Sequence, residues 1–388
     1  MIRNAVNALS DVYINSAAAF LPNRPVSNDE MEAVLGQIGG VPSRVRKMIL
    51  RANGIRSRYY AVNPQTGAAT HNAAQLAAEA IRALLAQGID PNTVSLLACA
   101  TSYPDQIMPG HAAMVHGLLP EIPPCEIGSH AGVCAAGMGA LLHAYRAIRC
   151  GGAGVAVACA AENASAVMRG TCFETAPRDW QQSTPELAFE QDFLRWMLSD
   201  GAGALALSSA PTKGRLNFKI RWIELFSYAG QMPVCMYAGA DFDPQGQWRS
   251  FKERAADIPA NILSVKQNVK LLNAEIIRYT VEKPLQALKD KYALHSEQID
   301  WFLPHYSSEF FRERVAQGLD NIGLPIAADK WFTNLHQKGN TGSASIYIIL
   351  EEFMRRSDIQ TGDTVLCYVP ESGRFSSSFM LLEAVDGR

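Results

Sequence analysis

Two stretches of the chain carry helical and strand patterns in the same order, and this repetition constrains the fold more than any other feature of the sequence. Residues 72–102, NAAQLAAEAIRALLAQGIDPNTVSLLACATS, predict an amphipathic helix, a turn and an apolar strand, and residues 276–307 repeat that order. A second pattern then follows in each half, over residues 125–162 in the first and 331–371 in the second. It consists of a loop of small residues, a helix, a glycine and an apolar strand that ends in glutamate. We therefore expect an α/β protein built from two similar halves with largely buried strands.

The repetition also predicts where the functional residues gather. Ligands of α/β folds bind at the carboxyl ends of strands. His305 lies at such an end, in LPHYSS, and Cys134 and Asn340 lie in loops that follow a strand, at corresponding places of the two halves. We expect an N-terminal half, residues 1–210, that carries the cysteine, and a C-terminal half, residues 211–388, that carries the histidine and the asparagine, with the three converging between them.

Cys134 stands in GVCAAGMGAL, where glycines and alanines clear space and a helix over about residues 135–148 begins. Unpaired amides and the helix dipole favour an anion at that place, so the pattern predicts a lowered pKa for the thiol. A nucleophile that accepts a large acyl group needs such clearing. The alternative is a cysteine that packs at the start of a helix.

His305 and Asn340 have ordinary structural interpretations when each is taken alone. A histidine after a proline is most often structural, and an asparagine among turn residues is most often a loop or cap residue. With a thiol they form a chemical set: the cysteine holds an acyl group, and two neutral donors stabilise an enolate formed by decarboxylation or deprotonation. This set is what carbon–carbon bond formation between thioesters requires.

Charge and cysteine usage exclude several classes of function. The chain has 35 basic and 37 acidic residues, a net charge of −2, so we expect binding neither to nucleic acid nor to a membrane surface. No signal peptide and no membrane-spanning run are visible, and the eight cysteines are scattered, several within apolar runs, which predicts a cytoplasmic protein. Cys125, His130 and Cys134 fit no common zinc spacing, so we expect no metal.

Several segments together resemble the ketosynthase III branch of the thiolase superfamily, the β-ketoacyl-acyl-carrier-protein synthase III type. The resemblance covers nearly the whole chain, and its motifs stand in the family's order. The segments are VYINSAAAFLPNRPVSNDEM, NGIRSRYYA, GVCAAGMGAL, LSDGAGALAL, LPHYSS, KGNTGSASI and VPESGRFSSSF.

The resemblance implies a thiolase-like fold, two similar halves in an αβαβα arrangement, and a homodimer. It implies that Cys134 is the nucleophile, that His305 and Asn340 act in the condensation, and that the amides of Cys134 and Gly373 form the oxyanion hole. It further implies phosphopantetheine thioesters of acyl carrier protein or coenzyme A as substrates and no cofactor. We also expect Met108 to contact substrate.

The chain departs from the family's pattern at the coenzyme A site. Met48 and Ala52 stand where the bacterial fatty-acid enzymes have a tryptophan and an arginine that grip the adenine end of coenzyme A. We therefore expect carrier-protein thioesters to be the better donors, with Arg312 and Arg314 contacting an acidic carrier. The departures resemble the subgroup of dialkylresorcinol and cyclohexanedione pathways, whose enzymes join two acyl units.

Glu162 ends a strand 28 residues after Cys134. It is either a base that removes an α-proton from a β-ketoacyl thioester or a buried structural carboxylate. The second interpretation is supported by Glu371, which ends the corresponding strand of the second half.

The expected function is acyl transfer to Cys134 and Claisen-type condensation with a β-ketoacyl or malonyl thioester, in fatty-acid-type or polyketide biosynthesis. The alternatives are acyl transfer to an alcohol or amine without condensation, and a partner subunit of a heteromeric synthase.

Overall fold

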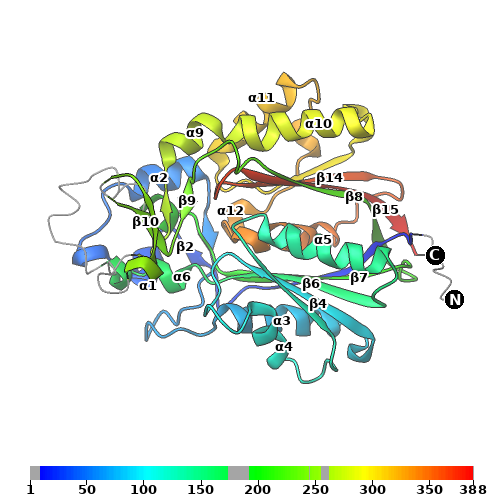
Figure 1. Cartoon of the computed structure of the whole chain (residues 1–388), viewed down its shortest axis with the longest axis horizontal. Helices are drawn as coiled ribbons and strands as arrows, with labels where there is room; N and C mark the ends of the chain where they lie inside the picture. The colour runs from blue at the N-terminus through cyan, green and yellow to red at the C-terminus, as the bar shows by residue number, and fades with distance from the viewer. Residues whose placement is uncertain (1–8, 174–191, 244, 255–261, 388) are drawn as a thin grey trace.

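The computed structural model describes residues 9–173, 192–243, 245–254 and 262–387, and its elements form five layers (Figure 1). Two layers are β-sheet, one layer of helices lies between them, and further helices cover both outer faces. The expected αβαβα arrangement of two similar halves is confirmed.

The first half of the sheet contains five strands that follow the order β1-β7-β6-β4-β5. The strands β4, β5 and β6 run parallel, whereas β7 is antiparallel to both of its neighbours. Their bounds are β1 Tyr13–Phe20, β4 Val94–Thr101, β5 Glu126–Ala131, β6 Val155–Glu162 and β7 Gly201–Ser208.

The second half repeats this arrangement in the order β8-β15-β14-β13. β13 and β14 run parallel and β15 is antiparallel to both of its neighbours, as in the first half. A fifth strand is reduced to one bridge, between Phe302 and Trp331. The bounds are β8 Leu216–Ser227, β13 Trp301–Pro304, β14 Thr364–Glu371 and β15 Ser376–Asp386.

The two halves meet where β1 pairs with β8, so that nine strands are joined. The expected division at residue 210 falls between the end of β7 at Ser208 and the start of β8 at Leu216. That the halves are separate domains stays a prediction.

The central layer is formed by α5 (Ala136–Arg149) and α13 (Ser345–Phe353), which share one apolar core with strands of both halves. They lie close because α5 carries Gly137 at the crossing: an added Cβ there would lie 2.2 Å from the carbonyl oxygen of Ser343. The hydroxyl of Tyr347 donates to the Gly137 carbonyl at 2.7 Å. The small residues after Cys134 thus bring the two corresponding loops together.

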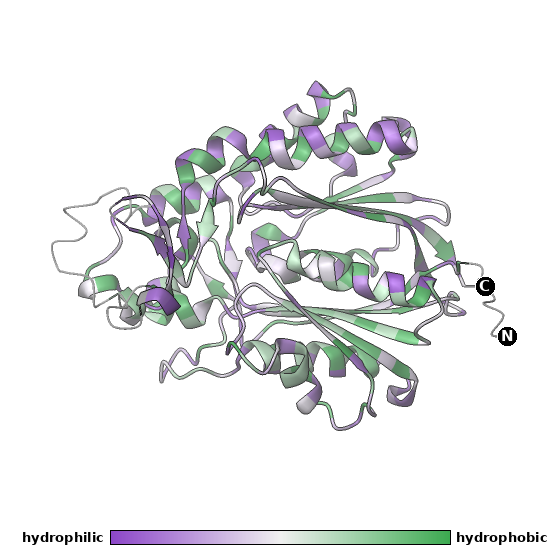
Figure 2. Cartoon of the chain, viewed as in Figure 1, coloured by the Kyte–Doolittle hydropathy of each residue, from purple (hydrophilic) through white to green (hydrophobic). Residues whose placement is uncertain are grey.

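The outer helices are amphipathic, and their apolar faces cover the sheet (Figure 2). α3 begins where the Asn72 side chain accepts from the Gln75 amide at 2.8 Å and the Gln75 side chain accepts from the Asn72 amide at 2.9 Å, a capping box. One face is covered by α3 (Ala73–Leu85) and α4 (His111–Gly117), the other by α9 (Val269–Ile277), α10 (Lys283–Tyr292) and α11 (Arg312–Asn321).

Short elements gather at one end of the layers, on the left of Figure 1. They are β2 (Val26–Ser27), α1 (Met31–Leu35), α2 (Arg46–Asn53), β3 (Ser57–Arg58), α6 (Ser165–Met168), β9 (Met236–Tyr237), β10 (Ala240–Phe242), β11 (Trp248–Ser250), β12 (Lys266–Gln267) and α12 (Leu335–Lys338). None of the helices in the described ranges is long and apolar enough to cross a membrane.

Candidate active site

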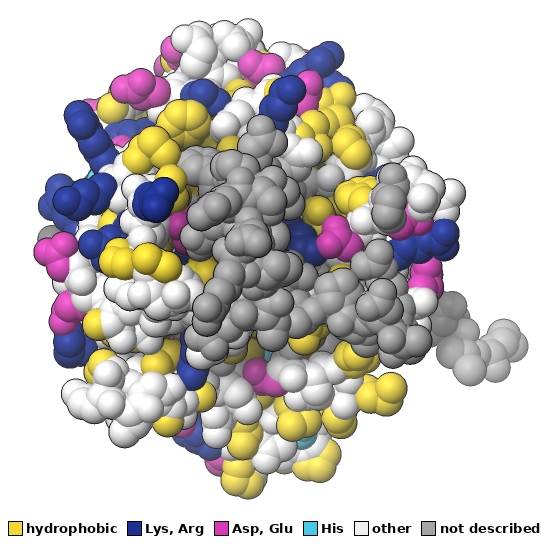
Figure 3. All heavy atoms as spheres, turned by 90° about the vertical axis from the view of Figure 1, so that its left-hand side faces the viewer, with side chains coloured by type: hydrophobic (Ala, Val, Ile, Leu, Met, Phe, Trp, Pro, Cys, Tyr) yellow, Lys and Arg dark blue, Asp and Glu magenta, His cyan; other side chains and the backbone are white. Residues whose placement is uncertain are grey.

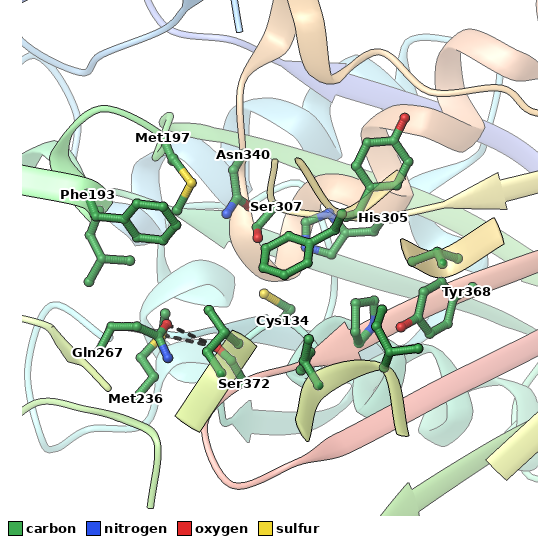
Figure 4. Close-up of a pocket in the computed structure, with 18 residues that line it drawn as sticks. Cys134, Phe193, Met197, Met236, Gln267, His305, Ser307, Asn340, Tyr368 and Ser372 are labelled. Atoms are coloured by element: carbon green, nitrogen blue, oxygen red, sulfur yellow. Dashed lines mark hydrogen bonds between the residues drawn. The ribbon is translucent and has the colours of Figure 1, made fainter. Parts of the chain in front are cut away.

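Cys134 lies in the turn between β5, which ends at Ala131, and α5, which begins at Ala136. The helix begins one residue later than the pattern predicts. The side chain is half-buried and lines a cavity that also contains His305 and Asn340 (Figure 4). The structure therefore brings together the three residues that the sequence places at corresponding strand ends.

His305 follows the last residue of β13 and is anchored to the neighbouring strand β14. Its amide donates to the Tyr368 carbonyl at 2.8 Å, and the side chain is only 3% exposed. Burial lowers the pKa of the imidazole to about 4, because the protein interior disfavours its charged form. At neutral pH the ring is uncharged, with one nitrogen that donates and one that accepts.

Asn340 is held by its backbone and by its own side-chain oxygen. Its amide donates to the Met197 carbonyl at 3.1 Å, and its carbonyl accepts from Ser199 at 2.8 Å. The side-chain oxygen accepts from the Gly342 amide at 3.0 Å. This leaves the Asn340 Nδ2 group to donate, and Asn340 lines the cavity together with His305 and Cys134 (Figure 4).

The rest of this cavity is mainly apolar. Gln267 and Ser372 lie at one side of it, joined by a hydrogen bond of 3.3 Å. The apolar wall consists of Phe193, Leu194, Met197, Met236, Leu272, Ile276, Ile277, Phe311, Val315 and Pro370, with the rings of Tyr306 and Tyr368.

A second cavity meets the first at Cys134, Asn340 and Met236. Its walls include Glu162 and Ser102 and are otherwise largely apolar, with Val133, Ala164, Val167, Met168, Leu198 and Val265 among them. The thiol thus stands where two largely apolar cavities meet.

The electrostatics of Cys134 differ from the expectation of a lowered pKa. Burial raises the pKa of the thiol, and the nearby carboxyls of Glu371 and Glu162 raise it further. The amides of Val133 and Ala135, on either side of the cysteine, donate to a Glu371 oxygen at 3.1 Å and 3.0 Å. The helix start therefore holds a carboxylate already, and Cys134 is a thiol in the resting protein.

Glu162 ends β6 and connects two loops near the site. One of its oxygens accepts from the amide and hydroxyl of Ser102, at 3.0 Å and 2.7 Å, and from the amide of Ser343 at 3.0 Å and its hydroxyl. Burial raises the pKa of the carboxyl. The side chain lines the second cavity with Cys134, so both interpretations, base and structural carboxylate, stay predictions.

Of the other predicted residues, Gly373 lies beside the nucleophile loop and Met108 lies outside the two cavities that contain Cys134. Gly373 follows β14 beside the nucleophile loop: an added Cβ there would lie 3.0 Å from a methyl of Val133. Met108 is 79% exposed and lines neither of the two cavities that contain Cys134. Its role in substrate binding stays a prediction.

The two arginines predicted to contact a carrier lie on α11, beside the first cavity. Arg312 approaches a Glu309 oxygen at 3.6 Å and stacks on Trp331, and Arg314 stacks on Phe310 with 4.1 Å to the ring centre. Figure 3 shows further Lys and Arg side chains, together with apolar ones, on the face that lies at the left of Figure 1. The carrier role stays a prediction.

Sequence reasoning missed the bonds of Glu371 and most of the cavity wall. The corresponding positions of Glu162 and Glu371 were visible in the sequence, but the loop that each contacts was not. Leu272 and Ile276 have helical spacing, which any core helix shows. Over the described ranges, no group of three or more His, Cys, Asp or Glu side chains is placed to hold a metal ion.

Comparisons with known proteins find enzymes with similar sequences. The family model described as 3-oxoacyl-[acyl-carrier-protein (ACP)] synthase III C terminal matches residues 290–378, which include His305 and Asn340. The beta-ketoacyl-[acyl-carrier-protein] synthase III of Neisseria meningitidis serogroup A is 26% identical over 358 residues, 91% of this chain and 93% of that protein. The enzyme of that name from Rhizorhabdus wittichii is 27% identical over 359 residues, 92% of this chain and 93% of that protein.

Solved structures share the fold over almost the whole chain. AbyA1, a tetronic acid condensing enzyme, has a TM-score of 0.74 at 20% identity and covers 96% of this chain and 99% of its own. OleA of Xanthomonas campestris, solved with lauric acid and lauroyl-CoA, has a TM-score of 0.73 at 18% identity, with 97% and 99% covered. The thiolase-like fold is confirmed, and over nearly its whole length the chain is similar to enzymes of the 3-oxoacyl-acyl-carrier-protein synthase III family.

Proposed function

We propose that this protein is an acyltransferase that condenses two thioesters. Cys134 accepts an acyl group from a carrier-protein or coenzyme A thioester and joins it to a β-ketoacyl or malonyl thioester in a Claisen-type reaction. The observation that carries the proposal is the convergence of Cys134, His305 and Asn340, from both halves of the chain, on one cavity with a mainly apolar wall.

The first step is acyl transfer. The Cys134 sulfur forms a bond to the thioester carbonyl carbon, the bond to the carrier's sulfur breaks, and the carrier leaves as a thiol. His305 is neutral, so its free ring nitrogen takes the proton from the cysteine and returns it to the leaving sulfur. The amides of Cys134 and Gly373 are the proposed donors to the oxyanion.

The second step forms the carbon–carbon bond. Loss of carbon dioxide from a malonyl thioester, or of an α-proton from a β-ketoacyl thioester, produces an enolate whose oxygen accepts hydrogen bonds from His305 and Asn340 Nδ2. The enolate carbon attacks the acyl carbonyl, the bond to the Cys134 sulfur breaks, and the thiolate takes a proton from solvent in the malonyl case or the α-proton that the base removed in the β-ketoacyl case. Both donors are neutral, and burial keeps the His305 imidazole uncharged down to about pH 4.

The second cavity supports an acceptor that has an apolar chain of its own. A malonyl group is small and polar and does not need an apolar cavity of its own. Two largely apolar cavities that meet at the thiol can instead hold the two acyl chains that the enzyme joins. For such an acceptor, we propose Glu162 as the base that removes the α-proton, because it lines the second cavity beside Cys134. Glu162→Gln should leave acylation near normal and stop solvent deuterium exchange at the α-carbon of a β-ketoacyl thioester.

Two partners belong to the proposal. An acyl carrier protein delivers the thioester, and a second copy of the chain completes a homodimer. β5 lies at the edge of the sheet with alternate residues exposed, which leaves an edge for a second copy.

Intact-protein mass spectrometry with a panel of acyl thioesters tests the proposal. Wild-type protein should gain the mass of one acyl group, and the Cys134→Ala variant should gain none. Adding malonyl or β-ketoacyl thioester should release the acyl group as a condensed product, with carbon dioxide in the malonyl case. Label that persists on Cys134→Ala would reject the nucleophile, and acyl transfer to alcohols without any condensed product would reject condensation.

A further inference from the structure

The carboxylate of Glu371 lies behind the loop that carries the nucleophile. This residue ends β14 of the second half, whereas the loop belongs to the first half. One carboxylate oxygen accepts from the amides of Val133 and Ala135, at 3.1 Å and 3.0 Å. The two amides are those on either side of Cys134.

Glu371 reaches the loop from the side opposite the substrate cavities. It lines a third cavity, with Gly132 and Ala135, and it does not line either cavity that contains Cys134. A thioester bound at Cys134 therefore does not touch Glu371, and any effect on the reaction passes through the loop.

The same arrangement exists in the other half without a nucleophile. Glu162 ends the corresponding strand and accepts from the amide of Ser343, three residues after Asn340, at 3.0 Å. Each half therefore sends a strand-end glutamate to the loop of the other half. Only Glu371 binds the amides that bracket a thiol.

Two consequences follow for Cys134. Glu371 holds the amides before and after Cys134, and this fixes the direction of the Cys134 amide, which is a proposed oxyanion donor. Burial raises the pKa of the Glu371 carboxyl, while the hydrogen bonds from the amides of Ala135 and Val133 favour its ionised form, whose negative charge disfavours a thiolate beside it.

We propose that Glu371 is a positioning residue, which holds the nucleophile loop in its reactive geometry and keeps Cys134 as a thiol until a thioester is bound. The proposal rests on the proposed function, because it assigns Cys134 as the nucleophile. In this role Glu371 also protects the cysteine from unwanted oxidation and alkylation, because both reactions require the thiolate.

The test is the pH dependence of Cys134 alkylation by iodoacetamide, read by mass spectrometry of the peptide that contains it. Glu371→Gln keeps an acceptor oxygen and removes the charge. A drop of about one unit in the thiol pKa raises the thiolate fraction roughly tenfold below that pKa, while the intrinsic nucleophilicity falls roughly threefold. Alkylation at pH 7 should therefore become about threefold faster, with the profile shifted to lower pH.

Two further variants complete the experiment. Glu162→Gln removes the same charge at the corresponding place of the other half and should shift the profile less, because its bonds go to Ser102 and Ser343. Glu371→Ala removes the oxygen that accepts both hydrogen bonds, so kcat for acyl transfer should fall roughly tenfold or more while KM changes little, and Glu371→Gln should retain most of kcat.

An unshifted or upward-shifted alkylation profile in Glu371→Gln, with a wild-type circular dichroism spectrum, would overturn the inference. The proposed function fails separately, if thioesters do not acylate the wild-type protein. Alkylation needs no thioester, so it still tests the role of Glu371 in that case. If Glu371→Ala does not fold, the Glu371→Gln profile decides.

Discussion

The burial of His305 predicts a measurable dependence of stability on pH. The ring is 3% exposed, and its pKa falls from 6.5 to about 4 in the folded protein. Because a base with a depressed pKa is held neutral by the fold, its contribution to stability is present above pH 6.5 and is lost as the pH falls toward 4. Acidification should therefore destabilise the protein through this residue.

The size of the effect follows from the two pKa values. At pH 5 the unfolded histidine is almost fully protonated and the folded one is almost fully neutral. The linkage relation then assigns to this group a loss of about 2 kcal/mol in the free energy of unfolding between pH 7 and pH 5. Over the whole interval the loss approaches about 3 kcal/mol, since one pKa unit corresponds to about 1.4 kcal/mol.

Urea unfolding at pH 7 and pH 5 measures this difference in the wild type and in His305→Asn. The variant loses some stability at both pH values, but it should lose about 2 kcal/mol less than the wild type on acidification. Comparison at two pH values cancels the other titrating groups.

Equal losses in the wild type and in His305→Asn would refute the reasoning. That result would mean that the folded protein accepts a charged imidazole at this position, through water or a rearranged neighbour. The proposal that His305 acts as a neutral donor would then need a different basis.

Three further predictions concern packing, catalysis and the carrier. Gly137→Ala places a methyl group against the carbonyl of Ser343. The clash outweighs the gain in helix propensity, so the free energy of unfolding, measured in urea, should fall by about 1–2 kcal/mol. Unchanged stability would show that the two central helices can move apart at little cost. Asn340→Ala should still be acylated but should condense roughly 10²-fold more slowly, as measured by product formation, and a protein that fails at acylation would contradict this division of roles. Arg312→Glu with Arg314→Glu should slow acylation by carrier-protein thioesters and weaken its salt dependence, whereas equal rates at low and high salt in the wild type would reject the basic contact.

The sequence by itself predicted the architecture and the three residues of the site. Repeated helix and strand patterns require two similar halves, because local periodicity reflects which face of each element is buried. Cys134, His305 and Asn340 stand at strand ends or in the loops after them, and the carboxyl ends of parallel strands meet at one edge of a sheet. The residue order along the chain is enough for such an inference.

Only the tertiary structure decided the state of the thiol. The sequence around Cys134 predicts a lowered pKa, because a helix start offers free amides. In the fold those amides are bonded to Glu371, more than 230 residues away along the chain, and the cysteine is half-buried. Burial and contacts between distant segments set the charge of a group, and local sequence does not contain them, whereas the position of a residue at a strand end is a local property.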